Sequence, residues 1–419
     1  MAPIPTPPRL SDVRGAAQLA FDAARGLVDV VERMHHTIQQ RPAPIGPATV
    51  GHTRGITGLV YRSVRGGVDL VGRGIEATLA TLAPLAPDES GRDSGPRRDT
   101  LLAVINGLHG DHLHRTGNPL ATPMSLRLHG QGIDAADPAV GLARAGSGPA
   151  SGKLVILVHG LCMNDRGWLR EGHDHGAALA AEQGWTPLYL RYSTGRSIAE
   201  NGRDFAALLD TLVAHWPCAL QSLVIIGHSM GGLVARSACL QAAEHGQAWL
   251  PALRRLVFLG TPHHGSPLER GGRKLFDTLG LSPYAAPLAG LSRHVSAGIR
   301  DLHHGSLTEG EHRHVDLPVG VHCQTIAATL GARRDLLAER LVGDGLVPLN
   351  SALGRHRDPA RRLHFAAGDQ WVAYQTGHLE LLSSPAVFER MRSWLADEPA
   401  APAHGLTPPD GDPGNVVPG

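Results

Sequence analysis

The sequence has few cysteines, almost no lysine and almost no net charge. The four cysteines are Cys162, Cys218, Cys239 and Cys323. They show no C-x-x-C spacing, which favours free thiols over a disulfide framework. Lys153 and Lys274 are the only lysines, and 39 basic residues nearly balance 38 acidic ones to give a net charge of +1. This balance gives no basis for a nucleic-acid partner.

Long apolar runs and metal-ligand motifs are also missing. The first eight residues contain four prolines and no apolar core of a signal peptide, and no run approaches the length of a membrane span. We therefore expect a cytoplasmic protein, with peripheral contact to a lipid surface left open. Paired histidines occur at His173/His175, His263/His264, His303/His304 and His312/His314. None has the spacing of a zinc site, so we expect neither a metal nor a cofactor.

The first hundred residues differ from the rest of the chain. Apolar positions recur every three to four residues over 10–40 and again over 56–82, which predicts two amphipathic helices. The second contains five glycines, so it needs a surface to stabilise it. That surface is the body of the protein, a lipid surface or another subunit. We expect residues 1–98 to form a helical extension and linker, and residues 398–419 to form a disordered tail.

Strand-like and helix-like segments alternate between about residue 99 and residue 397. The strand-like segments are Met124–His129, Lys153–Val158, Thr186–Tyr192, Ser222–Ile226, Leu253–Leu259, Val321–Thr329 and Arg361–Ala367. The helix-like segments are Glu171–Gln183, Gly202–His215, Gly232–His245 and Ser384–Asp397. Such alternation predicts an α/β domain with a mainly parallel sheet between helices. Residues 263–317 interrupt it and are predicted to be an insertion that covers the sheet as a lid or a fixed cap.

The sequence Gly227-His228-Ser229-Met230-Gly231 follows a run of buried-type β-branched residues and precedes a helical run. This arrangement is typical of a nucleophile elbow, a sharp turn that lifts a serine out of the sheet. Side chains at Gly227 or Gly231 would collide with their neighbours in such a turn. We therefore predict that Ser229 is a catalytic nucleophile.

A serine nucleophile needs a base, and the base needs an acid to orient it. After a nucleophile elbow these residues follow in the order acid, then histidine. His378 lies in the loop before the last helix, and Asp344 lies between two glycines in an earlier loop. We predict His378 as the general base and acid and Asp344 as its partner; Asp335 and Asp369 are the competing acids.

The tetrahedral intermediate requires two backbone N–H donors at its oxyanion. The amide of Met230, directly after the nucleophile, is predicted to supply one donor. The other is expected from Leu161, which follows His159-Gly160 after the strand at 153–158. The neighbouring Cys162 lacks the context of a nucleophile and is expected to be a small buried residue.

Residues 150–397 resemble the α/β-hydrolase superfamily, in particular bacterial lipases and esterases similar to triacylglycerol lipases and GPI inositol-deacylase-like proteins. The phrases that carry this resemblance are Val158-His159-Gly160-Leu161, Gly227-His228-Ser229-Met230-Gly231-Gly232, Leu259-Gly260-Thr261-Pro262-His263-His264-Gly265-Ser266, Gly343-Asp344-Gly345-Leu346-Val347-Pro348 and Gly377-His378. The resemblance implies an oxyanion hole at Leu161 and Met230, with acyl substrate beneath the insertion.

We accordingly expect a serine carboxylester hydrolase that cleaves small-molecule or lipid esters through an acyl-enzyme. An acyltransferase and a polyester depolymerase of the same fold remain open. A non-catalytic protein that binds a lipid surface through residues 10–82 is the alternative from another class.

Overall fold

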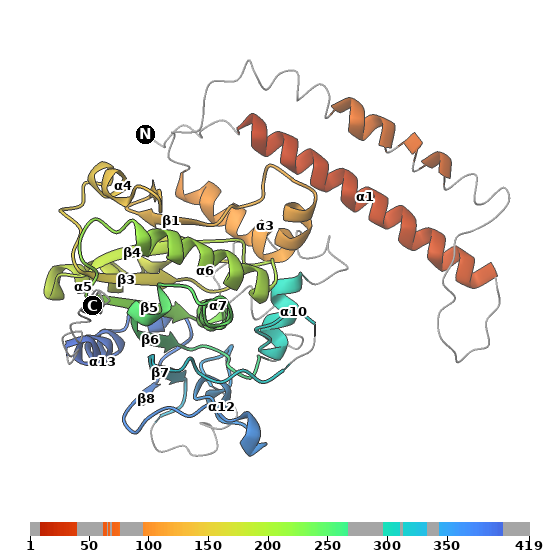
Figure 1. Cartoon of the computed structure of the whole chain (residues 1–419). Helices are drawn as coiled ribbons and strands as arrows, with labels where there is room; N and C mark the ends of the chain where they lie inside the picture. The colour runs from red at the N-terminus through yellow and green to blue at the C-terminus, as the bar shows by residue number, and fades with distance from the viewer. Residues whose placement is uncertain are drawn as a thin grey trace, which may run out of the picture.

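Eight strands form one sheet in the order β2-β1-β4-β3-β5-β6-β7-β8 (Figure 1). A computed structural model describes residues 9–39, 62–64, 66–67, 69–75, 95–266, 296–310, 313–332 and 343–396. The strands are β1 (Ser125–Leu128), β2 (Gln131–Ile133), β3 (Lys153–Val158), β4 (Thr186–Arg191), β5 (Ser222–His228), β6 (Leu253–Leu259), β7 (His322–Thr329) and β8 (Gln370–Tyr374). From β4 to β8 neighbouring strands are parallel, whereas β1 is antiparallel to β2 and β4. The predicted mainly parallel sheet is confirmed.

Helices connect and cover the strands. The longer ones are α1 (Leu10–Gln39), α3 (Pro96–Arg115), α4 (Pro138–Arg144), α5 (His175–Gln183), α6 (Ile198–Ala214), α7 (Met230–His245), α10 (Ala297–His304) and α13 (Pro385–Ala396). Short turns of helix lie at η2 (Asp165–Trp168), η3 (Leu250–Ala252), α12 (Leu349–Ala352), η5 (Pro359–Arg361) and η6 (Glu380–Leu382). Helix α6 packs on α7, and α13 packs on α5. Parallel strands need such crossover helices, which therefore cover the sheet.

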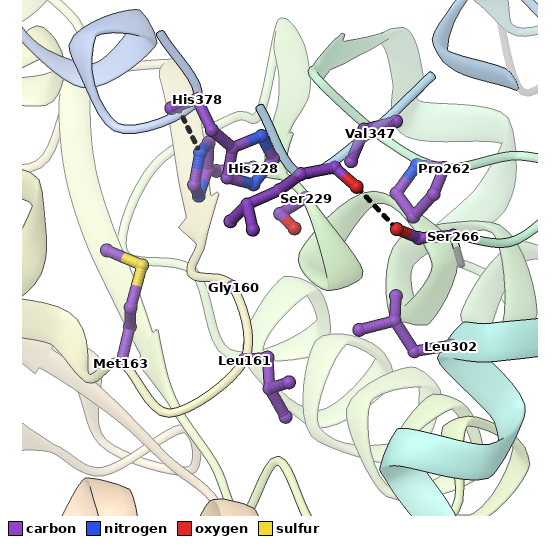
Figure 2. A pocket seen from close by; sticks show the side chains of 11 residues that line it. Gly160, Leu161, Met163, His228, Ser229, Pro262, Ser266, Leu302, Val347 and His378 are labelled. Carbon is purple, nitrogen blue, oxygen red and sulfur yellow. Dashed lines mark hydrogen bonds between the residues drawn. The ribbon is translucent and has the colours of Figure 1, made fainter. Parts of the chain in front are cut away.

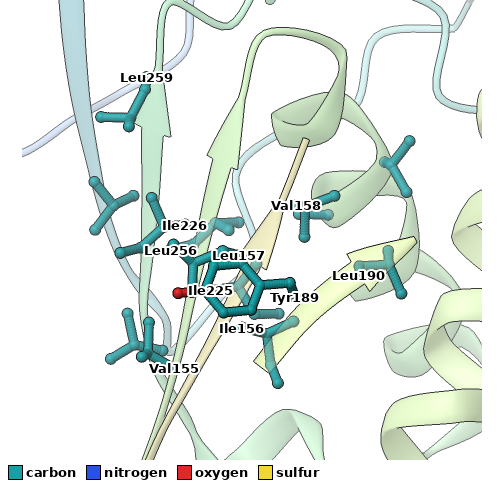
Figure 3. Packing of buried hydrophobic residues seen from close by; sticks show 14 of the residues in the cluster. Val155, Ile156, Leu157, Val158, Tyr189, Leu190, Ile225, Ile226, Leu256 and Leu259 are labelled. Carbon is teal, nitrogen blue, oxygen red and sulfur yellow. The ribbon is translucent and has the colours of Figure 1, made fainter. Parts of the chain in front are cut away.

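The core lies in the middle of the sheet. Every residue of β5 is buried, and five of the six residues of β3 are buried. Figure 3 shows the aliphatic side chains of β3, β5 and β6 packed together, with Tyr189 of β4 beside them. Strands buried on both faces are continuous apolar runs rather than alternating ones. The central strands were predictable from the sequence for that reason.

The last strand was predicted at the wrong place. The sequence indicates a strand at Arg361–Ala367, but β8 comprises Gln370–Tyr374. Residues 362–369 instead form a segment in which Leu363 bonds to the carbonyl of Gly354. Leu363 is buried and Phe365 half-buried. The alternation of apolar and polar residues therefore correctly predicted that one face of this segment is buried. A segment can bury one face without pairing with a neighbouring strand.

The N-terminal extension is helical where the structure describes it. Helix α1 confirms the first predicted helix, and the described residues of 62–75 are helical and lie beside α1 (Figure 1). A Cβ placed on Gly72 would lie 3.2 Å from the Phe21 ring. No helix in the described residues is long and apolar enough to cross a membrane. Lipid contact through residues 10–82 stays a prediction.

Helix α3 joins this extension to the body and includes the last residues of the predicted linker. Arg98 forms a two-fold ion pair with Asp12 of α1 at 2.6 and 2.7 Å, and His112 contacts Asp22 at 2.8 Å. Helix α10 is the described helical part of the 263–317 insertion. Residues 267–295 of that insertion and the tail from residue 397 lie outside the described residues.

Candidate active site

Ser229 occupies the turn between β5 and α7, the position predicted from the sequence. Its backbone angles are φ 54° and ψ −124°, a region that residues with a side chain seldom adopt. The Ser229 amide donates to the Leu259 carbonyl oxygen at 2.8 Å, where the neighbouring strand β6 ends. The turn is thus fixed at the carboxyl edge of the sheet.

Close packing explains the glycines around this turn. A Cβ on Gly227 would lie 2.5 Å from the Cα of Gly232, and one on Gly231 would lie 2.2 Å from the Val158 carbonyl oxygen. Real Cβ atoms do not approach other atoms so closely. The predicted collision at both positions is confirmed.

The structure brings His378 and Asp344 together. The Nδ1 of His378 lies 2.7 Å from Oδ2 of Asp344, and both side chains are almost fully buried. The His378 amide also donates to the Asp344 carbonyl oxygen at 3.1 Å. The second carboxylate oxygen, Oδ1, accepts from the amides of Leu346 and Val347 at 3.0 and 2.8 Å. Both oxygens of Asp344 are therefore held, and with them the imidazole ring.

Ser229 and His378 line the same small cavity (Figure 2). Its volume is about 20 Å³. The other lining residues are Gly160, Leu161, Met163, His228, Pro262, Ser266, Leu302, Leu346 and Val347. Most of these are apolar, so the hydroxyl and the imidazole face a mainly apolar space. With Nδ1 bonded to Asp344, the Nε2 of His378 is the nitrogen left to exchange a proton.

His228, the last residue of β5, supports the loop that carries His378 after β8. Its Nε2 lies 3.1 Å from the His378 carbonyl oxygen, and the two ring centroids are 4.7 Å apart. Burial, with His378 nearby, holds the pKa of His228 well below its ordinary value of 6.5. The ring is thus neutral, and the contact places its proton on Nε2. Sequence analysis did not predict this supporting role of His228. The only feature of the sequence that could have indicated it is the position of His228 directly before Ser229.

Leu161 and Met230, the predicted oxyanion donors, lie one after β3 and one at the start of α7. Leu161 follows the end of β3 and lines the cavity. Met230 is the first residue of α7, where N–H groups have no intrahelical acceptor. Cys162 is buried, and burial raises the pKa of its thiol to about 12. A thiol with that pKa stays protonated at neutral pH, in agreement with the expected small buried residue.

Helix α3 packs directly behind the loop that carries Leu161. A Cβ on Gly107 of α3 would lie 2.3 Å from the Sγ of Cys162 and 3.2 Å from the Oγ1 of Thr194. Thr194 Oγ1 in turn accepts from the Cys162 amide at 3.1 Å. Cys162 has a positive φ of 57°, a backbone conformation that residues with a side chain seldom adopt. The contacts with Gly107 and Thr194 hold the loop in this conformation. No pattern in the sequence indicates this contact.

The competing acids are separated from the cavity or lie outside the described residues. Asp369 precedes β8 and contacts His322 and Gln324 of β7 at 2.6 and 2.8 Å. It therefore lies at the amino edge of the parallel strands, the edge opposite to Ser229. Asp335 lies outside the described residues.

The histidine pairs do not form a metal site in the described part of the chain. His173 Nε2 contacts His175 Nδ1 at 2.8 Å, and His175 Nε2 contacts the Leu381 carbonyl oxygen at 2.9 Å. His263 does not line the cavity; its Nδ1 lies 3.3 Å from Nη1 of buried Arg236. Pro262 and Ser266 line the cavity instead.

Comparison with known proteins gives one family match. Residues 209–313 match the family described as PGAP1-like alpha/beta domain. This segment includes β5, the Ser229 turn and α7. No curated protein matches the chain.

Several solved structures are similar. The mature form of the Bacillus licheniformis lipase BlEst2 has a TM-score of 0.40 and 19% identity, over 59% of this chain and 94% of that one. EstA from Clostridium botulinum has a TM-score of 0.38 and 14% identity, over 60% and 89%. The epoxide hydrolase VrEH1 from Vigna radiata has a TM-score of 0.35 and 13% identity, over 59% and 92%.

The sheet order, the strained serine turn and the PGAP1-like segment agree with one another. The chain has the fold of an α/β hydrolase, and residues 209–313 of it match the PGAP1-like alpha/beta domain.

Proposed function

We propose that the protein is a serine carboxylester hydrolase of the lipase and esterase type. Ser229 is the nucleophile, His378 the general base and acid, and Asp344 the residue that orients the imidazole. One observation carries the proposal: Ser229 and His378 share a cavity, and His378 is hydrogen-bonded to a buried carboxylate. A buried carboxylate on Nδ1 stabilises the imidazolium that forms when Nε2 accepts a proton.

The reaction has two stages. Ser229 Oγ attacks the ester carbonyl carbon and its proton moves to His378 Nε2. The tetrahedral intermediate then releases the alcohol, which takes that proton, and leaves an acyl group on Ser229. A water molecule loses a proton to His378 and attacks the acyl group; the acid leaves, and the proton returns to Ser229.

The negative charge of each tetrahedral intermediate is stabilised by the amides of Leu161 and Met230. The Leu161 amide lies in the loop after β3, and the Met230 amide lies in the first turn of α7. The two donors therefore come from two different elements at the carboxyl edge of the sheet. Fixed backbone donors need no reorganisation during the reaction. The partial positive charge at the start of α7 acts in the same direction.

The apolar lining favours an uncharged acyl group. Leu302, Leu346 and Val347 lie on the cavity wall with Ser229. An ester with a hydrocarbon acyl group buries apolar surface there without leaving a charge unpaired. The proposed substrates are therefore hydrophobic esters.

Hydrolysis of p-nitrophenyl acetate by wild type and by Ser229→Ala tests the proposal. We expect hydrolysis in the wild type and a loss of at least roughly a thousandfold in the variant. Labelling with a fluorophosphonate should occur on Ser229 of the wild type and be absent from the variant. Ser393→Ala, at an exposed serine of α13, is the matched control and should change neither result.

An unchanged rate in Ser229→Ala would exclude Ser229 as the nucleophile. Absence of both hydrolysis and labelling in the wild type would support the non-catalytic alternative. The acyltransferase alternative is tested by adding an alcohol to the assay. A hydrolase then forms mainly the carboxylic acid, whereas an acyltransferase forms mainly the ester of the added alcohol.

A further inference from the structure

The cavity beside Ser229 is very small for an ester hydrolase. Its volume of about 20 Å³ is enough for about one water molecule. A methyl group is of similar size, whereas a long hydrocarbon chain needs many times that volume. The length of the acyl group therefore depends on whether the walls can move.

Helix α10 forms the wall at Leu302 and is tied to the body along its length. Its first turn bonds to α3 and to the loop after β4: Ser296 Oγ to the Gly107 carbonyl oxygen at 2.8 Å, Ala297 N to Asp111 Oδ2 at 3.2 Å and Gly298 N to the Gly195 carbonyl oxygen at 3.0 Å. Further along, Asp301 Oδ2 accepts from the Ile198 amide at 2.8 Å. These partners belong to elements packed on the sheet.

The last turn of α10 is bonded next to the cavity itself. The Leu302 carbonyl oxygen accepts from the Ser266 amide at 3.2 Å, and His303 Nδ1 lies 3.1 Å from the Ser266 carbonyl oxygen. Leu302 is 3% exposed and belongs to the main hydrophobic core. Moving this wall would break hydrogen bonds at both ends of the helix and uncover core surface.

The walls at Leu346 and Val347 are held by residues of the site. Ser266 Oγ donates to the Leu346 carbonyl oxygen at 2.5 Å (Figure 2). The Val347 amide donates to Asp344 Oδ1 at 2.8 Å. Displacing Val347 would therefore disturb the carboxylate that orients His378.

The geometry points to a fixed acyl subsite that accepts short acyl groups, acetyl best of all, with Leu302 setting the length. This inference rests on the proposed function and narrows its substrate class. The described part of the insertion acts as a wall of the site rather than as a lid that opens for long chains.

A series of p-nitrophenyl esters, from acetate through butyrate and octanoate to palmitate, tests the inference on the full-length protein. In the wild type, kcat/KM is expected to be highest for acetate and to fall by roughly tenfold or more between acetate and octanoate. Leu302→Ala should raise the octanoate-to-acetate ratio of kcat/KM by roughly tenfold, since it removes three carbon atoms from the wall.

Leu307→Ala is the matched control. Leu307 is another 3%-exposed core leucine just beyond α10, and it does not line the cavity. Both variants should lose thermal stability, but only Leu302→Ala should change the ratio. Assays are made below the melting temperature of both variants, and the wild-type series stands even if neither variant folds.

The outcomes separate the two proposals. Ser229-dependent hydrolysis of palmitate as fast as acetate would overturn the short-chain subsite and leave the esterase proposal intact. An equal change of ratio in Leu302→Ala and Leu307→Ala would overturn the role of Leu302. Absence of all hydrolysis and of fluorophosphonate labelling would overturn both proposals.

Discussion

The side chain of His228 donates from Nε2 to the backbone carbonyl of His378 at 3.1 Å. One histidine of the serine turn thus holds the loop that carries the other. The ring is buried, and its Nδ1 has no partner within the described residues. Since the ring belongs to the residue before Ser229, the bond fixes the serine and the His378 loop relative to each other.

We therefore expect His228 to be a positioning residue. His228→Leu should lower kcat by roughly tenfold to a hundredfold with little change in KM, because small displacements of a base lower the rate steeply. His228→Gln keeps an N–H donor and should restore part of the rate. Ester hydrolysis and the rate of fluorophosphonate labelling measure both effects. Equal losses in the two variants would argue against the hydrogen bond.

Asp344→Asn should leave the loop in place but reduce turnover. The amide oxygen can still accept from Val347 N, whereas the NH₂ group cannot stabilise an imidazolium on His378 as a carboxylate does. We expect kcat to fall by roughly a thousandfold or more. Asp369→Asn, at the opposite edge of the sheet, is the control and should retain the rate. A large loss in Asp369→Asn alone would make Asp369 the acid.

Gly107→Ala should affect the site from helix α3. Its Cβ would meet the Sγ of Cys162 at 2.3 Å, so the loop of Leu161 must shift or α3 must move away. We expect lower kcat together with a lower melting temperature. Gly67→Ala is the control, at an exposed helical glycine where an added Cβ would meet no atom within 4 Å. It should change kcat little and stabilise by up to about 1 kcal/mol. Normal kcat in Gly107→Ala would show that the loop tolerates the extra methyl.

Asp99 should be important for stability. Its buried carboxylate in the first turn of α3 pairs with Arg166 and with Arg191, each at 3.0 Å. Asp99→Ala leaves these guanidinium groups without that partner and should lower the free energy of unfolding by about 3–5 kcal/mol. Asp12→Ala, which removes the more exposed pair with Arg98, should lower it by less than about 1 kcal/mol. Urea unfolding of both variants measures the difference in the free energy of unfolding. Equal losses in the two variants would contradict the greater importance of the buried Asp99 pairs.

Buried histidines should make the protein less stable in weak acid. Burial lowers the pKa of His159 and of His175 from 6.5 to about 4. Between these values the unfolded chain binds protons that the folded chain does not, so the free energy of unfolding falls as pH falls through this window. Over the whole window each histidine contributes on the order of 3 kcal/mol.

Urea unfolding between about pH 7 and about pH 5 checks this pH dependence, because most carboxylates remain ionised there. His175→Gln should show a weaker dependence than the wild type, although it loses the bond to the Leu381 carbonyl if the new amide does not reach it. A constant free energy of unfolding over this range would contradict the predicted proton uptake.

The sequence alone determined the central strands and the serine turn, because both depend on neighbours in the chain. Continuous apolar runs at 153–158 and 222–226 specify buried strands, and the glycines beside Ser229 specify a turn that excludes other side chains. The order of loops along the chain predicted Asp344 as the partner of His378, with Asp335 and Asp369 left as competing acids. Parallel strands bring their following loops to one edge of the sheet, so chain order carries that spatial information.

Only the tertiary structure decided the rest. Arg361–Ala367 has the alternation of a strand, yet it packs by one face beside Gly354 instead of joining the sheet. Asp369 and Asp344 both follow plausible strand patterns, and the true start of β8 placed them at opposite edges. Leu302 of α10 and the serine turn form walls of one cavity, so its size depends on how close they lie. These residues are far apart in the chain, and no local pattern of sequence records the distance between them.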